Sequence, residues 1–427
     1  RLQTVKQEGE CAALLSRNEW ERPIRGDHPD LDAARDTGLK PILTKKLARK
    51  LKPMFETSVR RTIYPMRDGQ TEIELTLDEG KVVAGRKASP LHEVELELKS
   101  GAPIDLFKLA RQLGQDVPIQ LSLRTKSERG YALVDGKPFE PVKALPVVLT
   151  RDYAADASLQ AIARACLHQL IANQPLIRVG KPEALHQMRV AVRRLRAALS
   201  LFSAMLTDTQ SQELKSQLRW LTSELTPARE LDVFIGRVTE LMADKPGLAT
   251  VLQDLRQRRG QAYARVRSAC NSFRSRDLVL STAAWIEVGD WTRNSDEDAR
   301  ALRQRSVVEA ADDELQRRAK KIRKHGKHLD KLSPRRRHKL RLQTKKLRYA
   351  AEFFAAVFPG RKASKKREIF VATLEKLQDA LGELNDITVH EDLSAGLVHH
   401  NGNDDRSTDR ARARKALAAG RRAGFVA

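Results

Sequence analysis

The chain has 427 residues, of which 41% are hydrophobic and only 5% aromatic, and its formal net charge is +24. This length exceeds what one ordinary hydrophobic core serves, so we expect two domains, with three as the alternative. The large positive charge predicts a polyanionic partner. It does not distinguish between a nucleic acid, an anionic membrane and a phosphate polymer.

The cysteines and the ends of the chain bear on its location. The cysteines are scattered, odd in number and without zinc-ligand spacing, which predicts a cytoplasmic protein. No apolar run approaches the roughly 18 residues that a membrane helix needs, and the first ten residues lack the apolar core of a signal peptide. The chain begins without Met, as if already inside a strand, so we expect missing upstream residues.

Residues 1 to about 145 alternate apolar and polar side chains in the manner of β-strands. The stretch QTEIELTLDEGKVVAG predicts a hairpin with its turn at Asp78-Glu79-Gly80. LHEVELELKSG predicts a strand with its glutamates on one face, and PIQLSLRTKSERGYALVDG predicts another strand pair. DLFKLARQLG, ending at Gly114, and KKLARKLKPMF are expected to form short helices.

Several of these strands carry charges at alternate positions, in RNEWE and LRTKSE as well as in the glutamate strand. For a single strand, the solvated outer face of an antiparallel sheet is the better explanation. Mixed charges on successive strands fit a different structure, the lumen of a closed barrel in which carboxylates hold a divalent cation and basic residues hold phosphates.

The stretches QTVK, RNEWE, FETSVRRT, IELTLDEG, HEVELELKSG and LRTKSERGY together resemble the CYTH family of triphosphate tunnel metalloenzymes, over roughly residues 1–135. The resemblance implies an eight-stranded antiparallel tunnel that binds triphosphate with Mg²⁺ or Mn²⁺. It implies phosphate contacts from Lys6, Arg61, Lys126 and Arg129. It implies that the metal ligands are Glu93 and Glu95, with Glu19 or Glu21 as a further acidic tunnel residue and Glu74 and Asp78 as weaker candidates.

The opening of the chain departs from this family. The family's first strand carries Glu-x-Glu-x-Lys, whose carboxylates ligate the catalytic metal, and no such pattern opens this chain. The stretch ECAALLSRNEWE aligns with a later strand pair. We therefore expect a barrel that is either unclosed or closed without its metal ligands. The catalytic residues are then unknown, and this chain is expected to be inactive, although a complete form would be a metal-dependent inorganic triphosphatase.

The second half of the chain repeats one helical pattern. HQMRVAVRRLRAALSLF begins at His186, and HKLRLQTKKLRYAAEFF begins 152 positions later at His338. On a helical wheel with about 100° per residue, each copy places a histidine and basic residues on one side and apolar residues on the other. The first stripe comprises His186, Arg189, Arg193 and Arg196, and the second stripe comprises His338, Arg341, Lys345 and Arg348.

Two further stretches, LRWLTSELTPARELDVF and LEKLQDALGELNDITVH, match at an offset of 156 residues. This predicts a duplication with about four helices in each copy. Two such bundles related by a pseudo-twofold axis would bring the stripes near one another, with Arg194 and Lys346 on their flanks. The predicted fold class is therefore α+β multidomain, with an incomplete antiparallel β tunnel or barrel followed by an all-α pair of four-helix bundles. We expect domains at 1–143 and 158–400, a linker at 144–157, repeats at about 158–295 and 296–400, and a basic tail or terminal helix at 401–427.

A basic helix face is usually just solvated, and for one occurrence this explanation would be preferred. Recurrence of the stripe, histidine included, favours an anion site. A linear phosphate polymer suits a line of cations, because arginine pairs bidentately with phosphate oxygens. Histidine beside phosphate should bind better when protonated, which predicts stronger binding at mildly acidic pH. Neither histidine has partners at metal-ligand spacing.

The stretches LHQMRVAVRRLRAALSLF, RELDV, RHKLRLQTKKLRYAAEFF and LGELND resemble the CHAD family of α-helical domains, over roughly residues 155–400. The resemblance implies a basic groove that binds inorganic polyphosphate. With the first domain, it implies tripolyphosphate as a second partner, no membrane, and a cytoplasmic protein associated with polyphosphate granules. The alternatives are an active metal-dependent triphosphatase and a nucleic-acid-binding basic protein with a relict β domain. Weak nucleic-acid binding is expected at low salt in either case.

Overall fold

The computed structural model describes residues 1–7, 18–26, 28–40, 42, 44–136, 139–242, 248–327, 329 and 332–398. The chain divides into two compact units, Arg1–Pro141 with Val279–Val288, and Val142–Leu278 with Gly289–Ala427. The expected tail at 401–427 lies outside the described residues. In the described ranges, no helix combines the length and apolar character that crossing a membrane requires.

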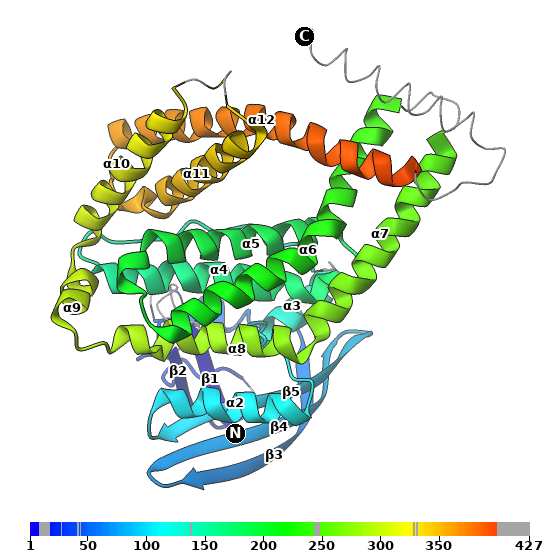
Figure 1. Ribbon diagram of the computed structural model, residues 1–427. Helices are drawn as coiled ribbons and strands as arrows, with labels where there is room; N and C mark the ends of the chain where they lie inside the picture. The colour runs from blue at the N-terminus through cyan, green and yellow to red at the C-terminus, as the bar shows by residue number, and fades with distance from the viewer. Residues whose placement is uncertain are drawn as a thin grey trace. The chain divides into compact units, whose positions relative to one another are not determined.

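The first unit contains two antiparallel sheets (Figure 1). The smaller sheet pairs β1 (Leu2–Gln7) with β2 (Asn18–Pro23), and the larger has the order β3 (Glu56–Asp68), β4 (Thr71–Ala84), β5 (Lys87–Ser100). The helices of this unit are α1 (Lys45–Ala48), α2 (Pro103–Asp116), α3 (Lys126–Asp135) and Val279–Val288, the last part of α8 (Phe273–Val288). The described strands do not close into the tunnel that the family resemblance implies, which agrees with the expected incomplete barrel.

The hairpin predicted at Asp78-Glu79-Gly80 is wrong, because β4 runs straight through these residues. The turns lie instead at the two ends of β4, where Gly69 has φ +57° and Gly85 has φ +58°. Each glycine begins a two-residue loop between paired strands, the position at which a positive φ matches the strand twist. Gly80 serves a different purpose, since a Cβ there would lie 2.0 Å from the carbonyl oxygen of Ser58 on β3.

The strand pair predicted after residue 117 is also wrong, because Lys126–Asp135 is a helix. Thr125 caps its first turn by accepting from the Glu128 backbone, and the Glu128 side chain accepts in return from the Thr125 backbone. This capping box satisfies two amides that would otherwise lack partners. Gly130 lets α3 approach Phe55 so closely that a Cβ would lie 2.3 Å from the ring. The local capping signal therefore outweighs the apparent alternation.

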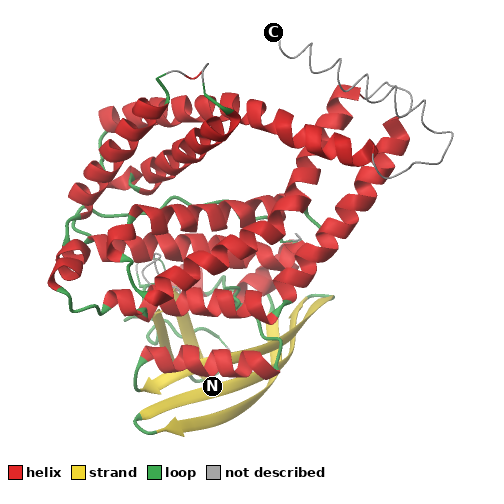
Figure 2. Ribbon diagram, in the orientation of Figure 1, coloured by secondary structure: helices red, strands yellow, loops and turns green. Residues whose placement is uncertain are grey.

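The second unit is helical (Figure 2), which confirms the α+β fold class. The helices are α4 (Ala155–Ile177), α5 (Pro182–Leu201), α6 (Thr209–Met242), α7 (Leu248–Asn271), the first residues of α8 (Phe273–Val288), α9 (Glu297–Gln304), α10 (Val307–His325), α11 (Pro334–Phe353) and α12 (Arg361–Val398). The apolar sides predicted for the duplicated helices are buried as expected, at Met188, Val192, Leu195 and Leu199 of α5 and at Leu340 and Leu347 of α11. Phe202 and Phe354, the residues directly after these helices, are buried too.

Helices α5 and α11 pack against each other through contacts that the duplication relates. Arg194 Nη1 lies 3.6 Å from Glu352 Oε2, and Lys346 Nζ donates to Ser200 Oγ at 3.4 Å. Arg194 and Lys346 are 152 residues apart, and so are Ser200 and Glu352, so the two contacts join equivalent positions of the two copies. Phe202 and Phe354, also one offset apart, stack edge to face with centroids 6.2 Å apart. Reciprocal contacts of this kind define an isologous interface, so the two copies meet across a pseudo-twofold axis.

The segment before α4 has no regular structure but is fixed within the second unit. The Asn173 side chain accepts from the Val142 amide at 3.0 Å and donates to its carbonyl at 2.9 Å. Val147 and Leu149 are buried. This segment, part of which we expected to be a linker, therefore packs as part of the helical unit.

Candidate functional site

The first unit places carboxylates directly opposite one another on β4 and β5. The register pairs Asp78 with Glu93 and Glu74 with Glu97, while Glu95 lies opposite Thr76. Like charges at directly opposed positions destabilise a sheet. Cations must therefore compensate this face. They come from α3 and β3 for Asp78, Glu93 and Glu95, and from Lys99 of β5 itself for Glu74 and Glu97.

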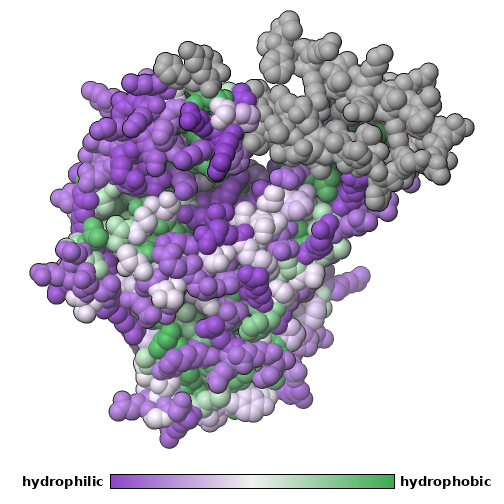
Figure 3. Space-filling model, viewed as in Figure 1, coloured by the Kyte–Doolittle hydropathy of each residue, from purple (hydrophilic) through white to green (hydrophobic). Residues whose placement is uncertain are grey.

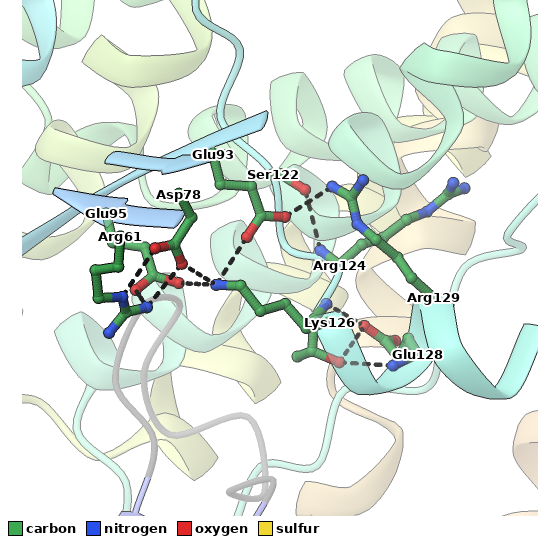
Figure 4. A network of polar contacts seen from close by, with 10 residues as sticks. Arg61, Asp78, Glu93, Glu95, Ser122, Arg124, Lys126, Glu128 and Arg129 are labelled. Atoms are coloured by element: carbon green, nitrogen blue, oxygen red, sulfur yellow. Dashed lines mark hydrogen bonds and ion pairs between the residues drawn. The ribbon is translucent and has the colours of Figure 1, made fainter. Parts of the chain in front are cut away.

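Lys126, in the first turn of α3, provides the central cation (Figure 4). Its Nζ lies 3.0 Å from Asp78, 3.1 Å from Glu93 and 2.5 Å from Glu95. Burial lowers the Lys126 pKa, but hydrogen bonds to Glu95, Asp78 and Glu93 outweigh it and raise the pKa above its usual value. The ammonium therefore stays charged and holds three carboxylates together.

Arg61 on β3 completes the network from the other side. Its Nε and Nη2 donate to the two Asp78 carboxylate oxygens at 2.8 and 2.7 Å, and Nη2 also reaches Glu95 at 3.2 Å. Asp78 is fully buried. The hydrogen bond from Arg61 is the main reason that the Asp78 pKa is lowered to about 2, against the opposing effect of burial.

The structure brings together most, but not all, of the triphosphate-site residues implied by sequence. Arg129 joins the network through Glu93, at 2.9 Å. Lys6 lies in the β1–β2 sheet, where its Nζ is 3.0 Å from Glu19, and Glu21 accepts there from the Thr4 hydroxyl. Sequence reasoning ranked Asp78 as a weak candidate, whereas it is the most deeply buried acid of the network.

The implied metal ligands Glu93 and Glu95 are neutralised within the chain. The Lys126 ammonium stands among the carboxylates where a cation would be held. Across the described ranges, no group of three or more His, Cys, Asp or Glu side chains is arranged to hold a metal ion. In this arrangement the described residues do not by themselves form a metal site.

In the second unit, the first stripe faces hydroxyl groups of α6. Arg189 donates to Thr226 at 2.5 Å, and Arg196 donates to Thr222 at 3.3 Å. Both threonines in turn donate to carbonyls of their own helix, Leu218 and Thr222, which fixes their orientation. These acceptors are neutral, so they position the guanidinium groups without cancelling their charge.

The first stripe is electrostatically strained. Burial, followed by the charge of Arg193, lowers the Arg189 pKa to about 10. Burial and then Arg219 lower the Arg196 pKa. Burial and then Arg229 lower the His186 pKa below its usual value of 6.5. Charged groups whose protonated forms are disfavoured in this way would be stabilised by an anion placed among them.

The second stripe, on α11, differs from the first. His338 is exposed, and Arg341 and Lys345 are half-buried. Arg348 is held by carboxylates, with Nη1 2.6 Å from Glu352 and 3.3 Å from Glu375. Several arginine Nε atoms in the described part of the chain are buried without a hydrogen-bond acceptor, among them those of Arg193 in the first stripe and of Arg341 and Arg348 in the second. Each stripe thus offers a buried donor that an oxyanion could satisfy.

Further cations gather where α5, α10 and α11 meet. Burial lowers the Lys346 pKa, and the charges of Arg318, Arg196 and Lys321 lower it further. The surface over α10 is almost entirely hydrophilic (Figure 3). Its exposed basic residues are Arg317, Lys320, Lys321, Arg323 and Lys324. Sequence reasoning placed Lys346 on the flank of its stripe and did not find the threonines, because neither a hydroxyl acceptor nor an inter-helix neighbour has a periodic signature.

These features define the class of protein, a duplicated helical domain that presents clustered cations, joined to a small β unit built on an ion-pair network. The CHAD domain model matches residues 161–395, more than half of the chain, and the chain belongs to this family. The CYTH domain model matches residues 1–131. Both family resemblances seen in the sequence are confirmed.

The chain is also similar to individual proteins. Inorganic triphosphatase from Haemophilus influenzae is 34% identical over 131 residues, covering 30% of this chain and only 37% of that protein's length. The crystal structure of the CHAD domain from the plant Ricinus communis matches with a TM-score of 0.57 and 28% identity, over 66% of this chain and 91% of that one. PptA from Streptomyces chartreusis matches with a TM-score of 0.42 and 17% identity, over 63% and 96% of the two chains.

Proposed function

We propose that the helical unit binds inorganic polyphosphate along both stripes, from His186 to Arg196 on α5 and from His338 to Arg348 on α11. The observation that carries the proposal is the set of partners of the first stripe. Two of its arginines, Arg189 and Arg196, donate to neutral threonine hydroxyls. The charge of Glu230 only partly offsets the burial and the neighbouring cations that lower the Arg189 pKa. Such a cluster is poorly stable alone and gains most from an anion with closely spaced charges.

A nucleic acid is the second candidate, and the structure gives it less support. Binding of single strands relies on aromatic side chains for base stacking. The first stripe is flanked by threonines instead. Backbone charge alone still supports weak binding of nucleic acid at low salt.

Competition between long-chain polyphosphate and duplex DNA at physiological salt separates the two candidates. We expect polyphosphate to displace DNA, and the reverse result would contradict the proposal. Charge reversal to Glu at Arg189, Arg193, Arg341 and Lys345 should abolish polyphosphate binding and leave the circular dichroism spectrum unchanged. A matched control reverses four exposed cations off the stripes, Arg151, Arg256, Arg265 and Arg300, and should retain most of the binding.

For the first unit we propose descent from a triphosphate hydrolase that uses Mg²⁺ or Mn²⁺, with Arg61, Lys126 and Arg129 as phosphate contacts and Lys6 as an outlying one. In this chain, we propose, the unit is inactive, because the carboxylates expected to hold metal are occupied by Lys126. Incubation with tripolyphosphate and either metal should release no phosphate above background. Turnover that depends on the metal would contradict this proposal and favour the active enzyme.

We further propose that residues 1–143 and 158–400 act as the two domains, with residues 144–157 as a connection that packs with the helical unit. We propose that the protein works in the cytoplasm at polyphosphate granules. Co-localisation of the tagged protein with granules, and its release when the first-stripe arginines are reversed, would test this location.

A further inference from the structure

The two repeats are not electrostatically equal, although their sequences align. Arg196 on α5 and Arg348 on α11 are equivalent through the 152-residue offset. Arg196 donates to the neutral Thr222, whereas Arg348 is paired with two carboxylates, Glu352 and Glu375.

The difference can be traced to two positions that the duplication relates. The residue four positions after the arginine is Ser200 in the first copy and Glu352 in the second. On the neighbouring helix, the 156-residue offset aligns Arg219 of α6 with Glu375 of α12. The first copy therefore has a neutral serine where the second has Glu352, and a cation where the second has Glu375.

The alignment of α6 with α12 is structural as well as sequential. Leu218 and Leu374, which precede Arg219 and Glu375, are both buried. Thr222 donates to the Leu218 carbonyl, and its counterpart Gln378 donates to the Leu374 carbonyl. Glu375 contacts Arg348, and the charge of Arg219 acts on Arg196, so Arg219 and Glu375 occupy corresponding places beside their stripes.

Arg219 lies on the same face of α6 as Thr222, three residues further on, and so beside Arg196. In the first copy the cations repel one another and lack an acidic partner in the described contacts of Arg196. In the second copy, a phosphate group reaching Arg348 must displace Glu375, which lies 3.3 Å from the guanidinium and is exposed.

We propose that the first stripe is the high-affinity half of the polyphosphate site, and that Arg219 and Glu375 set the difference between the halves. Arg219 adds attraction for the polymer beside Arg196, and Glu375 acts as an internal competitor for Arg348. This inference rests on the proposed binding of polyphosphate by the two stripes.

The test exchanges the two charges separately. Arg219→Glu should weaken binding of long-chain polyphosphate at physiological salt about tenfold, and Glu375→Arg should strengthen it about tenfold, since each changes the local charge by two units. The controls Arg300→Glu and Glu240→Arg change the net charge equally at exposed positions elsewhere. They should change the affinity by about twofold or less.

Arg219→Gln should weaken binding and Glu375→Gln should strengthen it, each about threefold. These two variants test the inference if a charge-reversed variant does not fold. If the unaltered protein binds and the exchanges match their controls, this inference alone is overturned. If the unaltered protein binds no polyphosphate, the proposed function and this inference both fail.

Discussion

Replacement of Asp78 by Asn should destabilise the first unit by about 2 kcal/mol at pH 7. Asp78 is fully buried and accepts two hydrogen bonds from Arg61, at 2.8 and 2.7 Å, with Lys126 3.0 Å away. Asn keeps the shape and removes the charge. The pKa of Asp78 is about 2, against the usual 3.8, and this shift corresponds to about 2 kcal/mol of stabilisation.

The dependence on pH has a definite sign. Because the folded-state pKa of Asp78 is lowered, its contribution is fully present above about pH 4 and is lost as the pH falls towards 2. The gap in stability between the two proteins should therefore be largest at neutral pH and shrink at pH 3. Arg61 is half-exposed, with 47% of its side chain accessible, which keeps the cost below that of a fully buried ion pair.

Hydrogen exchange of the β4 amides measures this stability in the intact chain. At pH 7, Asp78→Asn should speed exchange through opening of the sheet about 30-fold, the factor that corresponds to about 2 kcal/mol. The control is Asp105→Asn, which removes a more accessible carboxylate bonded to Thr71 and Lys108 and should speed exchange much less. Equal exchange in the two variants would refute the reasoning, as would a stability gap in urea unfolding that stays constant between pH 7 and 3.

Three further predictions concern the helical unit. Polyphosphate affinity should rise as the pH falls from about 7.5 to 5.5, because burial lowers the His186 pKa and bound phosphate favours the protonated ring. The affinity of His186→Gln, measured by titration, should depend less on pH. An unchanged pH dependence would show that His186 is not responsible. Thr226→Val should weaken binding about threefold by releasing Arg189 from its acceptor, whereas equal affinity in the same titration would show that the hydroxyl does not position it. Tyr263→Phe should lower the free energy of unfolding by about 1 kcal/mol, since the Tyr263 phenol donates to the nearly buried Asp232 at 2.8 Å. An unshifted midpoint of thermal unfolding would contradict this.

The helical half was largely predictable from sequence. Its apolar positions recur with the helical period, so the buried sides of α5 and α11 follow from spacing alone. The repeat itself predicted that the two copies would meet, and the reciprocal contacts of Arg194 and Lys346 agree with that prediction. The packing of these two cations at the junction between the copies was not predicted, because it depends on which helix lies opposite.

The β unit was harder to predict, for two local reasons. Asp78-Glu79-Gly80 has the composition of a turn, but the Arg61 ion pair and the close approach of Ser58 keep these residues extended. The segment beginning at Thr125 alternates like a strand, yet it carries the Thr-x-x-Glu pattern of a helix start. Giving weight to that capping pattern would have identified α3 and placed Lys126 in its first turn.

The unequal partners of Arg196 and Arg348 depend on tertiary structure. The alignment of Arg219 with Glu375 is visible in the sequence once the 156-residue offset is applied. The consequence of this alignment for binding cannot be predicted from the sequence, because only the packing of α6 on α5 and of α12 on α11 shows that both positions lie beside a stripe.

The most direct test of the account is a crystal structure of this chain with bound polyphosphate. The account predicts one continuous phosphate chain that contacts Arg189 and Arg193 on α5 and continues to Arg341 and Lys345 on α11. Phosphate groups bound away from both helices, or two unconnected chains on separate surfaces, would contradict it.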